Sequence, residues 1–101
     1  MRLVNGPLAG EGRVEIFHNN RWGTICDDSF DDADAETICS QLGYFDGFAR
    51  TVAAYGEGTG QIWLDQLECN GYESSILHCE ANPWGDHDCR HSEDAGVRCC
   101  K

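Results

Sequence analysis

The chain has 101 residues, and its 18 aspartates and glutamates against seven lysines and arginines give a formal net charge of −11. Nucleic-acid binding needs a basic surface, so this balance excludes nucleic acid as a physiological partner and favours cations or basic partners. No stretch approaches the roughly 20 apolar residues of a membrane span, so we expect no direct membrane insertion. Because no internal boundary, repeat or low-complexity tract interrupts the chain, it predicts a single domain over residues 1–101.

A hairpin is predicted over residues 13–26. Val14 and Ile16 alternate with polar neighbours, and Asn19-Asn20 supplies residues typical of a tight turn before the chain returns from Arg21. A helix is predicted next, over residues 32–42, with Asp31 or Asp32 as its N-cap. Its buried stripe has helical spacing and ends before Gly43, and it consists of Ala35, Ile38, Cys39 and Leu42.

The second half of the chain has shorter elements. We expect a strand at Arg50–Ala54 and an apolar strand at Gln61–Leu64, followed by a short helix up to Cys79 that Ser74 or Ser75 caps. Residues 80–94 are predicted to be a loop, and residues 97–99 a last strand. The mixture indicates an α+β fold with a curved sheet, one clear helix and long loops.

Cysteine usage indicates an oxidising, extracellular compartment, in a secreted protein or in the ectodomain of a membrane protein, because seven cysteines are many for a small glycine-rich domain. They occupy positions 26, 39, 69, 79, 89, 99 and 100. No Cys-x-x-Cys pair is present and the spacing fits no usual zinc pattern, so we interpret them as disulfides, whose pairing the spacing leaves open. Cys100 lies beyond the last apolar strand position, so we expect it to be the unpaired thiol, either free or bridging to another chain.

Several segments together resemble the scavenger receptor cysteine-rich (SRCR) family, and they follow the family's order across residues 2–99. They are RLVNG at 2–6, GRVEI at 12–16, RWGTICDD at 21–28, ICSQLGY at 38–44, YGEGTG at 55–60, IWLD at 62–65, WGDHDC at 84–89 and HSEDAGV at 91–97. This resemblance implies the compact SRCR fold, in which a curved antiparallel sheet cradles one main helix, with a short second helix, long loops and three disulfides.

The pairing of the cysteines is also implied by the resemblance, to the six-cysteine type of domain. The implied disulfides are Cys26 with Cys89, Cys39 with Cys99, and Cys69 with Cys79. Two features depart from the family pattern, since Phe30 stands where a tryptophan is usual and Cys100 has no counterpart.

Carboxylates lie close to several of these cysteines. Asp27 and Asp28 follow Cys26, Asp65 precedes Cys69, and Asp88 and Glu93 lie on either side of Cys89. If Cys26 bonds Cys89, several of these carboxylates are drawn together, and crowded carboxylates repel one another unless a cation lies among them. Oxygen ligands on adjustable loops favour Ca²⁺, with Mg²⁺ as the alternative ion. Without an ion, the same residues would be loop carboxylates that cap turns.

The resemblance assigns these carboxylates to two cation sites. The first corresponds to Asp27, Asp28 and Glu93, and the second to Asp65 and Asp88, with Glu68 as a further candidate. The family often has asparagine at the position of Asp88, so a carboxylate there should strengthen cation binding. An EF-hand is excluded, because a loop that starts at Asp27 has neither the required glycine nor the bidentate glutamate.

No hydrolase, metalloprotease or nucleotide-binding motif occurs, and we expect no enzyme activity. We interpret His87 and His91 as hydrogen-bonded loop residues. The expected function is a calcium-dependent ligand-binding module of a scavenger or innate-immune receptor or of a secreted protein, with polyanionic, glycan or protein ligands bound through the cation. The alternatives are a cation-independent protein–protein adhesion module with Trp63, Tyr72 or Trp84 as an anchor, and an accessory targeting domain of a larger secreted enzyme.

Overall fold

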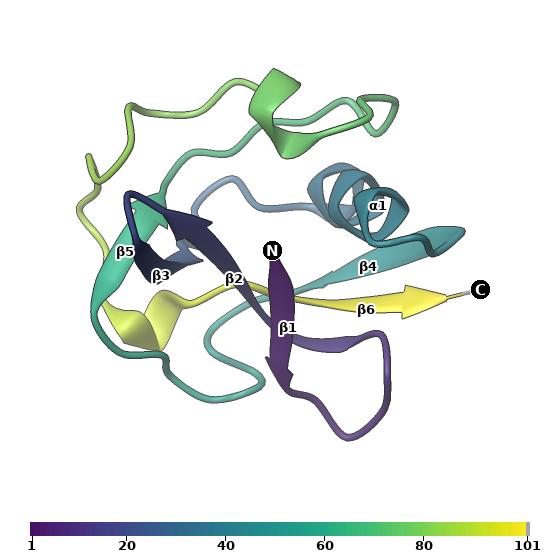
Figure 1. Ribbon diagram of the computed structural model, residues 1–101, viewed down its shortest axis with the longest axis horizontal. Helices are drawn as coiled ribbons and strands as arrows, with labels where there is room; N and C mark the ends of the chain where they lie inside the picture. Colours follow the sequence, from purple (N-terminus) through teal and green to yellow (C-terminus); the bar gives the residue numbers. More distant parts are fainter. Residues whose placement is uncertain (101) are drawn as a thin grey trace.

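The computed structural model describes residues 1–100 (Figure 1). Its elements are β1 (Arg2–Asn5), β2 (Glu11–His18), β3 (Arg21–Ile25), α1 (Asp32–Gln41), β4 (Asp46–Arg50), β5 (Gln61–Leu64), the 3₁₀ turns η1 (Ile76–His78) and η2 (His91–Glu93), and β6 (Gly96–Cys100). The strands form one six-stranded sheet in the order β4-β6-β2-β3-β5, and β1 pairs with β2. This α+β arrangement, with one helix against a curled sheet, confirms the predicted fold class.

The sheet is antiparallel except at one pair, which differs from the expectation of an antiparallel sheet. β3 and β5 run parallel, because the chain between them crosses over through α1 and β4 instead of turning back in a hairpin. The β2–β3 hairpin has the predicted turn, and both of its asparagines, Asn19 and Asn20, have positive φ angles.

The strand expected at residues 50–54 lies earlier in the chain, as β4. Residues 52–55 form a turn instead, in which Val52 and Ala53 have φ angles of 51° and 52°. Two hydrogen bonds hold this turn, from the Val52 N–H to the Asp27 carboxylate (2.7 Å) and from the Ala53 N–H to the Asp94 carbonyl (3.1 Å). Because these donors bond other segments, the backbone here does not extend the sheet.

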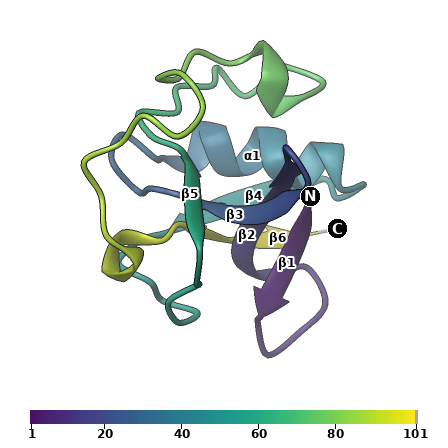
Figure 2. The ribbon, with the colours of Figure 1, turned by 60° about the vertical axis from the view of Figure 1, so that its left-hand side comes forward.

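Helix α1 packs against β4 and β6 and covers one face of the sheet (Figure 2). Asp31 is its N-cap, and Ala35, Ile38 and Cys39 are buried in the core as the spacing predicts. The contact with β4 is close enough to require glycine at position 47, where a Cβ atom would lie 2.5 Å from the Cys39 sulfur. No helix within residues 1–100 has the length and apolar character needed to cross a bilayer.

Three disulfides tie these elements together. Cys39–Cys99 joins α1 to β6, Cys26–Cys89 joins the residue after β3 to the loop before η2, and Cys69–Cys79 closes the segment that leads into η1. The first two span 60 and 63 residues, and the chain-entropy model assigns each such loop about 4 kcal/mol of stabilisation. The short second helix is the 3₁₀ turn η1, and Ser75 caps it.

Asp34 connects the start of α1 to this disulfide-closed segment. Its carboxylate is fully buried and accepts hydrogen bonds from the N–H groups of Cys69 (2.6 Å) and Asp31 (2.8 Å). Burial raises the pKa of the Asp34 carboxyl to about 7, although both hydrogen bonds oppose this rise. One side chain therefore satisfies two backbone donors from separate parts of the chain.

We expect Asp34→Ala to lower the free energy of unfolding by about 2–4 kcal/mol, because it leaves two backbone donors without their acceptor. Urea unfolding with the disulfides intact measures this loss. Glu36→Ala, on the exposed side of the same helix, is the matched control and should change stability by less than about 0.5 kcal/mol. Equal losses in the two variants would contradict this role of Asp34.

Candidate cation site

The candidate site forms where β3 ends between two other segments. The Cys26 N–H donates to the Leu64 carbonyl at the end of β5, and the Asp27 N–H donates to the Glu93 carbonyl in η2, both at 2.8 Å. The Cys26–Cys89 disulfide adds the loop before η2 to the same place. Main-chain hydrogen bonds and a covalent bond thus bring together residues from three distant parts of the sequence.

Asp28 lies at the centre of two groups of carboxylates. On one side, Asp28 and Glu93 offer oxygens within 4.8 Å of each other and of the Cys26–Cys89 sulfurs, and on the other side Asp28, Asp65 and Asp88 lie within the same distance of one another. The sulfurs belong to a disulfide, so they provide no thiolate ligand. The donors available to a cation are therefore carboxylate oxygens.

The second group opens into a small depression of about 240 Å³. Besides Asp65 and Asp88, its lining includes Asp86, His87 and Asn82. Asp65 comes from the end of β5 and is 1% exposed, whereas Asp88 lies on the exposed loop. An ion here would thus have one buried wall and one face open to solvent.

The cluster carries negative charge that no ion pair within residues 1–100 compensates. Desolvation raises the pKa of Asp28, and the carboxylates of Asp65 and Glu93 raise it further. Burial likewise raises the pKa of Asp65, although N–H groups of Gln66 and Asp88 oppose the rise. Within residues 1–100 the ion pairs are Arg2–Glu15, Arg13–Glu15, Arg98–Glu11 and His91–Asp94, and none of them includes a carboxylate of this cluster.

The structure groups the predicted site residues differently from the resemblance. Asp28 is shared between the two groups, whereas Asp27 is in neither, and one oxygen of the Asp27 carboxylate accepts the Val52 N–H. Glu68 lies in a separate depression with Glu80. Sequence analysis also missed Asp86, which lines the same depression as Asp88 and lies two residues before it in the WGDHDC segment.

The donor set fits a hard divalent cation. Carboxylate oxygens suit Ca²⁺ and Mg²⁺, and an exposed loop that can adjust its position suits the larger and more variable coordination shell of Ca²⁺. A zinc site in a cysteine-rich domain would contain thiolate ligands. This cluster contains none, because its two sulfurs form a disulfide. Calcium at this site, with Mg²⁺ as the alternative ion, therefore stays a prediction.

Comparison with known proteins places these features in one family. The family model of the scavenger receptor cysteine-rich domain matches residues 4–100. The crystal structure of the third SRCR domain of murine neurotrypsin is 51% identical to this chain, with a TM-score of 0.92, and the match covers 99% of this chain and 94% of that one. The dimeric form of the SRCR domain of mouse MARCO is 48% identical, with a TM-score of 0.85, and the match covers 98% of this chain and 93% of that one.

Proposed function

The chain belongs to the scavenger receptor cysteine-rich family, and from this premise we propose that it binds anionic ligands through calcium held by Asp28 and the carboxylates around it. Domains of the family are extracellular ligand-binding modules of receptors and secreted proteins. The finer proposal is that this module belongs to a scavenger or innate-immune receptor or to a secreted protein of that kind. Its ligands would be polyanions, glycans or proteins that present acidic groups.

The observation that carries the proposal is the position of Asp28 between two sets of carboxylates with no basic side chain of the described chain paired to them. Carboxylates held this close repel one another, and this repulsion destabilises the folded domain. A divalent cation among these carboxylates would remove the repulsion. Mg²⁺ is the alternative ion, although it demands a more regular shell than this loop provides.

The residues of the cluster would have different tasks. Asp65 is held in place by its bond from the Gln66 N–H (2.8 Å) and would fix the buried side of an ion. Asp28 would be shared between the two carboxylate groups, with Glu93 on one side and Asp88 on the exposed loop on the other. A bound calcium ion would supply positive charge on an otherwise acidic surface, where an anionic group of the ligand could complete its shell.

We expect calorimetric titration to give a calcium affinity on the order of 10⁻⁴–10⁻³ M, as in extracellular modules, and Asp28→Ala to abolish the tighter binding step. Glu57→Ala is the matched control, because Glu57 is an exposed carboxylate in the loop before β5 and lies outside the cluster. The control should bind calcium like the wild type. An unchanged isotherm for Asp28→Ala would rule out the placement of the ion.

Ligand binding should depend on the bound calcium ion. With dextran sulfate as an immobilised polyanion, we expect surface plasmon resonance to detect binding in millimolar calcium that is lost in EDTA and in Asp28→Ala. Loss of binding both in EDTA and in Asp28→Ala would show that the polyanion is bound through the ion and not directly by arginine side chains. Binding that persists in EDTA would contradict the proposed mechanism.

A specific observation favours one alternative, cation-independent adhesion. Trp84 is 36% exposed and Tyr72 lies fully on the surface, so both are available to a partner. Trp63 is not an anchor of this kind, because it is 7% exposed and its indole N–H donates to the Arg21 carbonyl. If a protein ligand still binds in EDTA and binds more weakly to Trp84→Ala, the adhesion alternative is favoured. No specific observation favours the other alternative, an accessory domain of a larger secreted enzyme.

Contact between two chains is the remaining part of the proposal. Cys100 is the free cysteine within residues 1–100, and it is half-buried at the end of β6. A disulfide between the Cys100 thiols of two chains would join two copies of the domain and double the number of cation sites available to a repetitive polyanion.

A further inference from the structure

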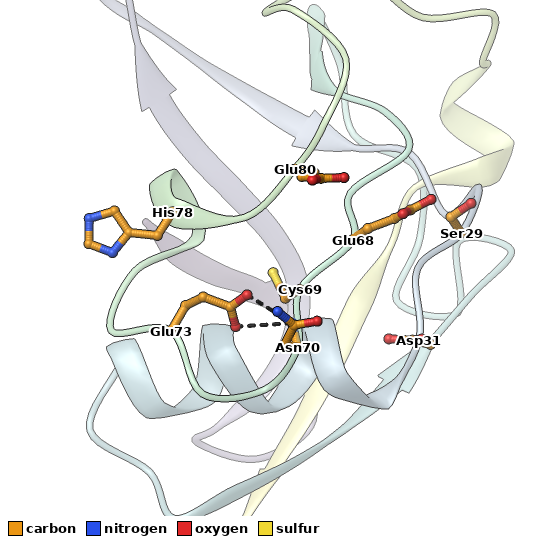
Figure 3. A pocket seen from close by; sticks show the side chains of 8 residues that line it. All are labelled: Ser29, Asp31, Glu68, Cys69, Asn70, Glu73, His78 and Glu80. Atoms are coloured by element: carbon orange, nitrogen blue, oxygen red, sulfur yellow. Dashed lines mark hydrogen bonds between the residues drawn. The ribbon is translucent and has the colours of Figure 1, made fainter.

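A depression of about 630 Å³, shown in Figure 3, is lined by residues other than the carboxylates of the candidate cation site. Its lining is acidic and includes Asp31, Glu68, Glu73 and Glu80, with His78 as the one residue of basic type. A second depression, of about 240 Å³, is lined mainly by apolar side chains, among them Leu77, Cys79, Ala81, Pro83 and Trp84. The two depressions share one wall, the segment 77–81.

Side chains alternate along this wall. His78 and Glu80 line the acidic depression, whereas Leu77, Cys79 and Ala81 line the apolar one. The segment is therefore a ridge, which we call the 77–81 ridge, with carboxylates on one side and an apolar groove on the other. A partner that straddles it would meet two kinds of chemistry a few ångströms apart.

Two glutamates of the acidic side lie directly opposite each other on paired backbone segments. Glu68 and Glu80 form an isolated antiparallel bridge, in which the Glu68 N–H donates to the Glu80 carbonyl at 2.8 Å. The neighbouring Cys69–Cys79 disulfide, with its Cα atoms 4.8 Å apart, holds the two backbones together. Like charges directly opposite each other on paired strands are destabilising, and neither glutamate has an ion-pair partner within residues 1–100.

The other two carboxylates of this depression already have structural tasks. Asp31 caps α1, and Glu73 accepts N–H groups of Asn70 (2.8 Å) and Gly71 (3.0 Å), as the dashed bonds to Asn70 in Figure 3 illustrate. These hydrogen bonds lower the pKa of Glu73, so it stays ionised. Glu68 and Glu80 are thus the two carboxylates of this depression that remain available to a binding partner. The charges of Asp31 and Glu73 strengthen the negative electrostatic potential around them.

The apolar side of the ridge combines an exposed leucine with a stacked aromatic ring. Leu77 is 69% exposed, although it adjoins a groove, and it also borders a further apolar depression lined by Phe17 and His18. Trp84 stacks face to face on His18, with ring centroids 3.8 Å apart, and meets the edge of Trp63. An exposed leucine beside a fixed aromatic ring is typical of a surface that anchors an apolar side chain of a partner.

We propose that the 77–81 ridge docks a cationic, amphipathic segment of a partner protein. An arginine or lysine of that segment lies between Glu68 and Glu80, where a guanidinium could bond both carboxylates. An apolar side chain of the same segment packs beside Leu77 and Trp84. Charge complementarity selects this occupant, because the ridge carries uncompensated carboxylates and, within residues 1–100, no third carboxylate lies close enough to Glu68 and Glu80 to form a metal site with them.

The test uses the whole domain in EDTA, so that it is independent of the calcium site. The probe is a capped peptide of six residues that alternate arginine and leucine, and the control peptide has glutamate in place of arginine. In NMR titrations of the ¹⁵N-labelled domain, we expect the arginine peptide to shift amides of residues 66–70 and 76–84. The glutamate peptide should not bind.

Two substitutions separate binding from folding. Glu68→Gln with Glu80→Gln should weaken the arginine peptide about tenfold and raise the melting temperature by about 2–4 °C, because it removes the repulsion. Leu77→Ala should also weaken the peptide. The control Glu57→Gln, which removes one negative charge from the exposed loop before β5, should change neither property.

Three outcomes of the peptide titrations would overturn the proposal. They are peptide affinity that is unchanged in the double glutamine variant, amide shifts that centre on the depression of Asp65 and Asp88, and equal binding of the glutamate peptide. A melting temperature that falls in the double variant would show that the two glutamates stabilise the free domain, which contradicts the argument from repulsion. Loss of calcium binding in Asp28→Ala has no bearing on any of these results, so this proposal and the proposed function can fail separately.

Discussion

The Cys26–Cys89 disulfide is the constraint on which the candidate cation site depends. It fastens the loop after η1 to the residue that follows β3, across 63 positions of sequence. Backbone bonds from Cys26 to Leu64 and from Asp27 to Glu93 align the same junction from two other sides. Without this cross-link, the part of the loop that carries Asp88 would lose its covalent tie to the end of β3, and the repulsion between carboxylates would favour its movement away from Asp28.

Charged side chains are distributed unevenly over the domain, which its composition alone does not reveal. Arginines of the sheet are used internally, with Arg13 bonded to Glu15 and Arg98 to Glu11. Apart from Asp28, which follows β3, the uncompensated carboxylates lie instead on the segments between β5 and β6, in the cluster around Asp28 and beside the 77–81 ridge. Both proposals therefore rest on the same physical feature, which is negative charge that the covalent framework holds together and the chain does not neutralise.

Some of this structure could be predicted from residue patterns. Helical spacing of Ala35, Ile38 and Cys39 predicted α1 and its buried side, and the Asn19-Asn20 pair predicted the hairpin turn, because these are local effects. The disulfide pairing came from family resemblance, since spacing alone leaves it open. The parallel β3–β5 pair, the bond from Asp27 to the turn at Val52 and the Glu68–Glu80 bridge were missed. All three depend on contacts between distant segments, which no local pattern encodes.

A crystal structure of the domain grown in calcium, at a concentration well above the dissociation constant, tests the central claim most directly. The account predicts an ion bound by carboxylate oxygens of Asp28 and of at least one neighbour among Asp65, Asp88 and Glu93, at the roughly 2.3–2.6 Å typical of Ca²⁺. Well-ordered carboxylates in the same places with only water between them would contradict it.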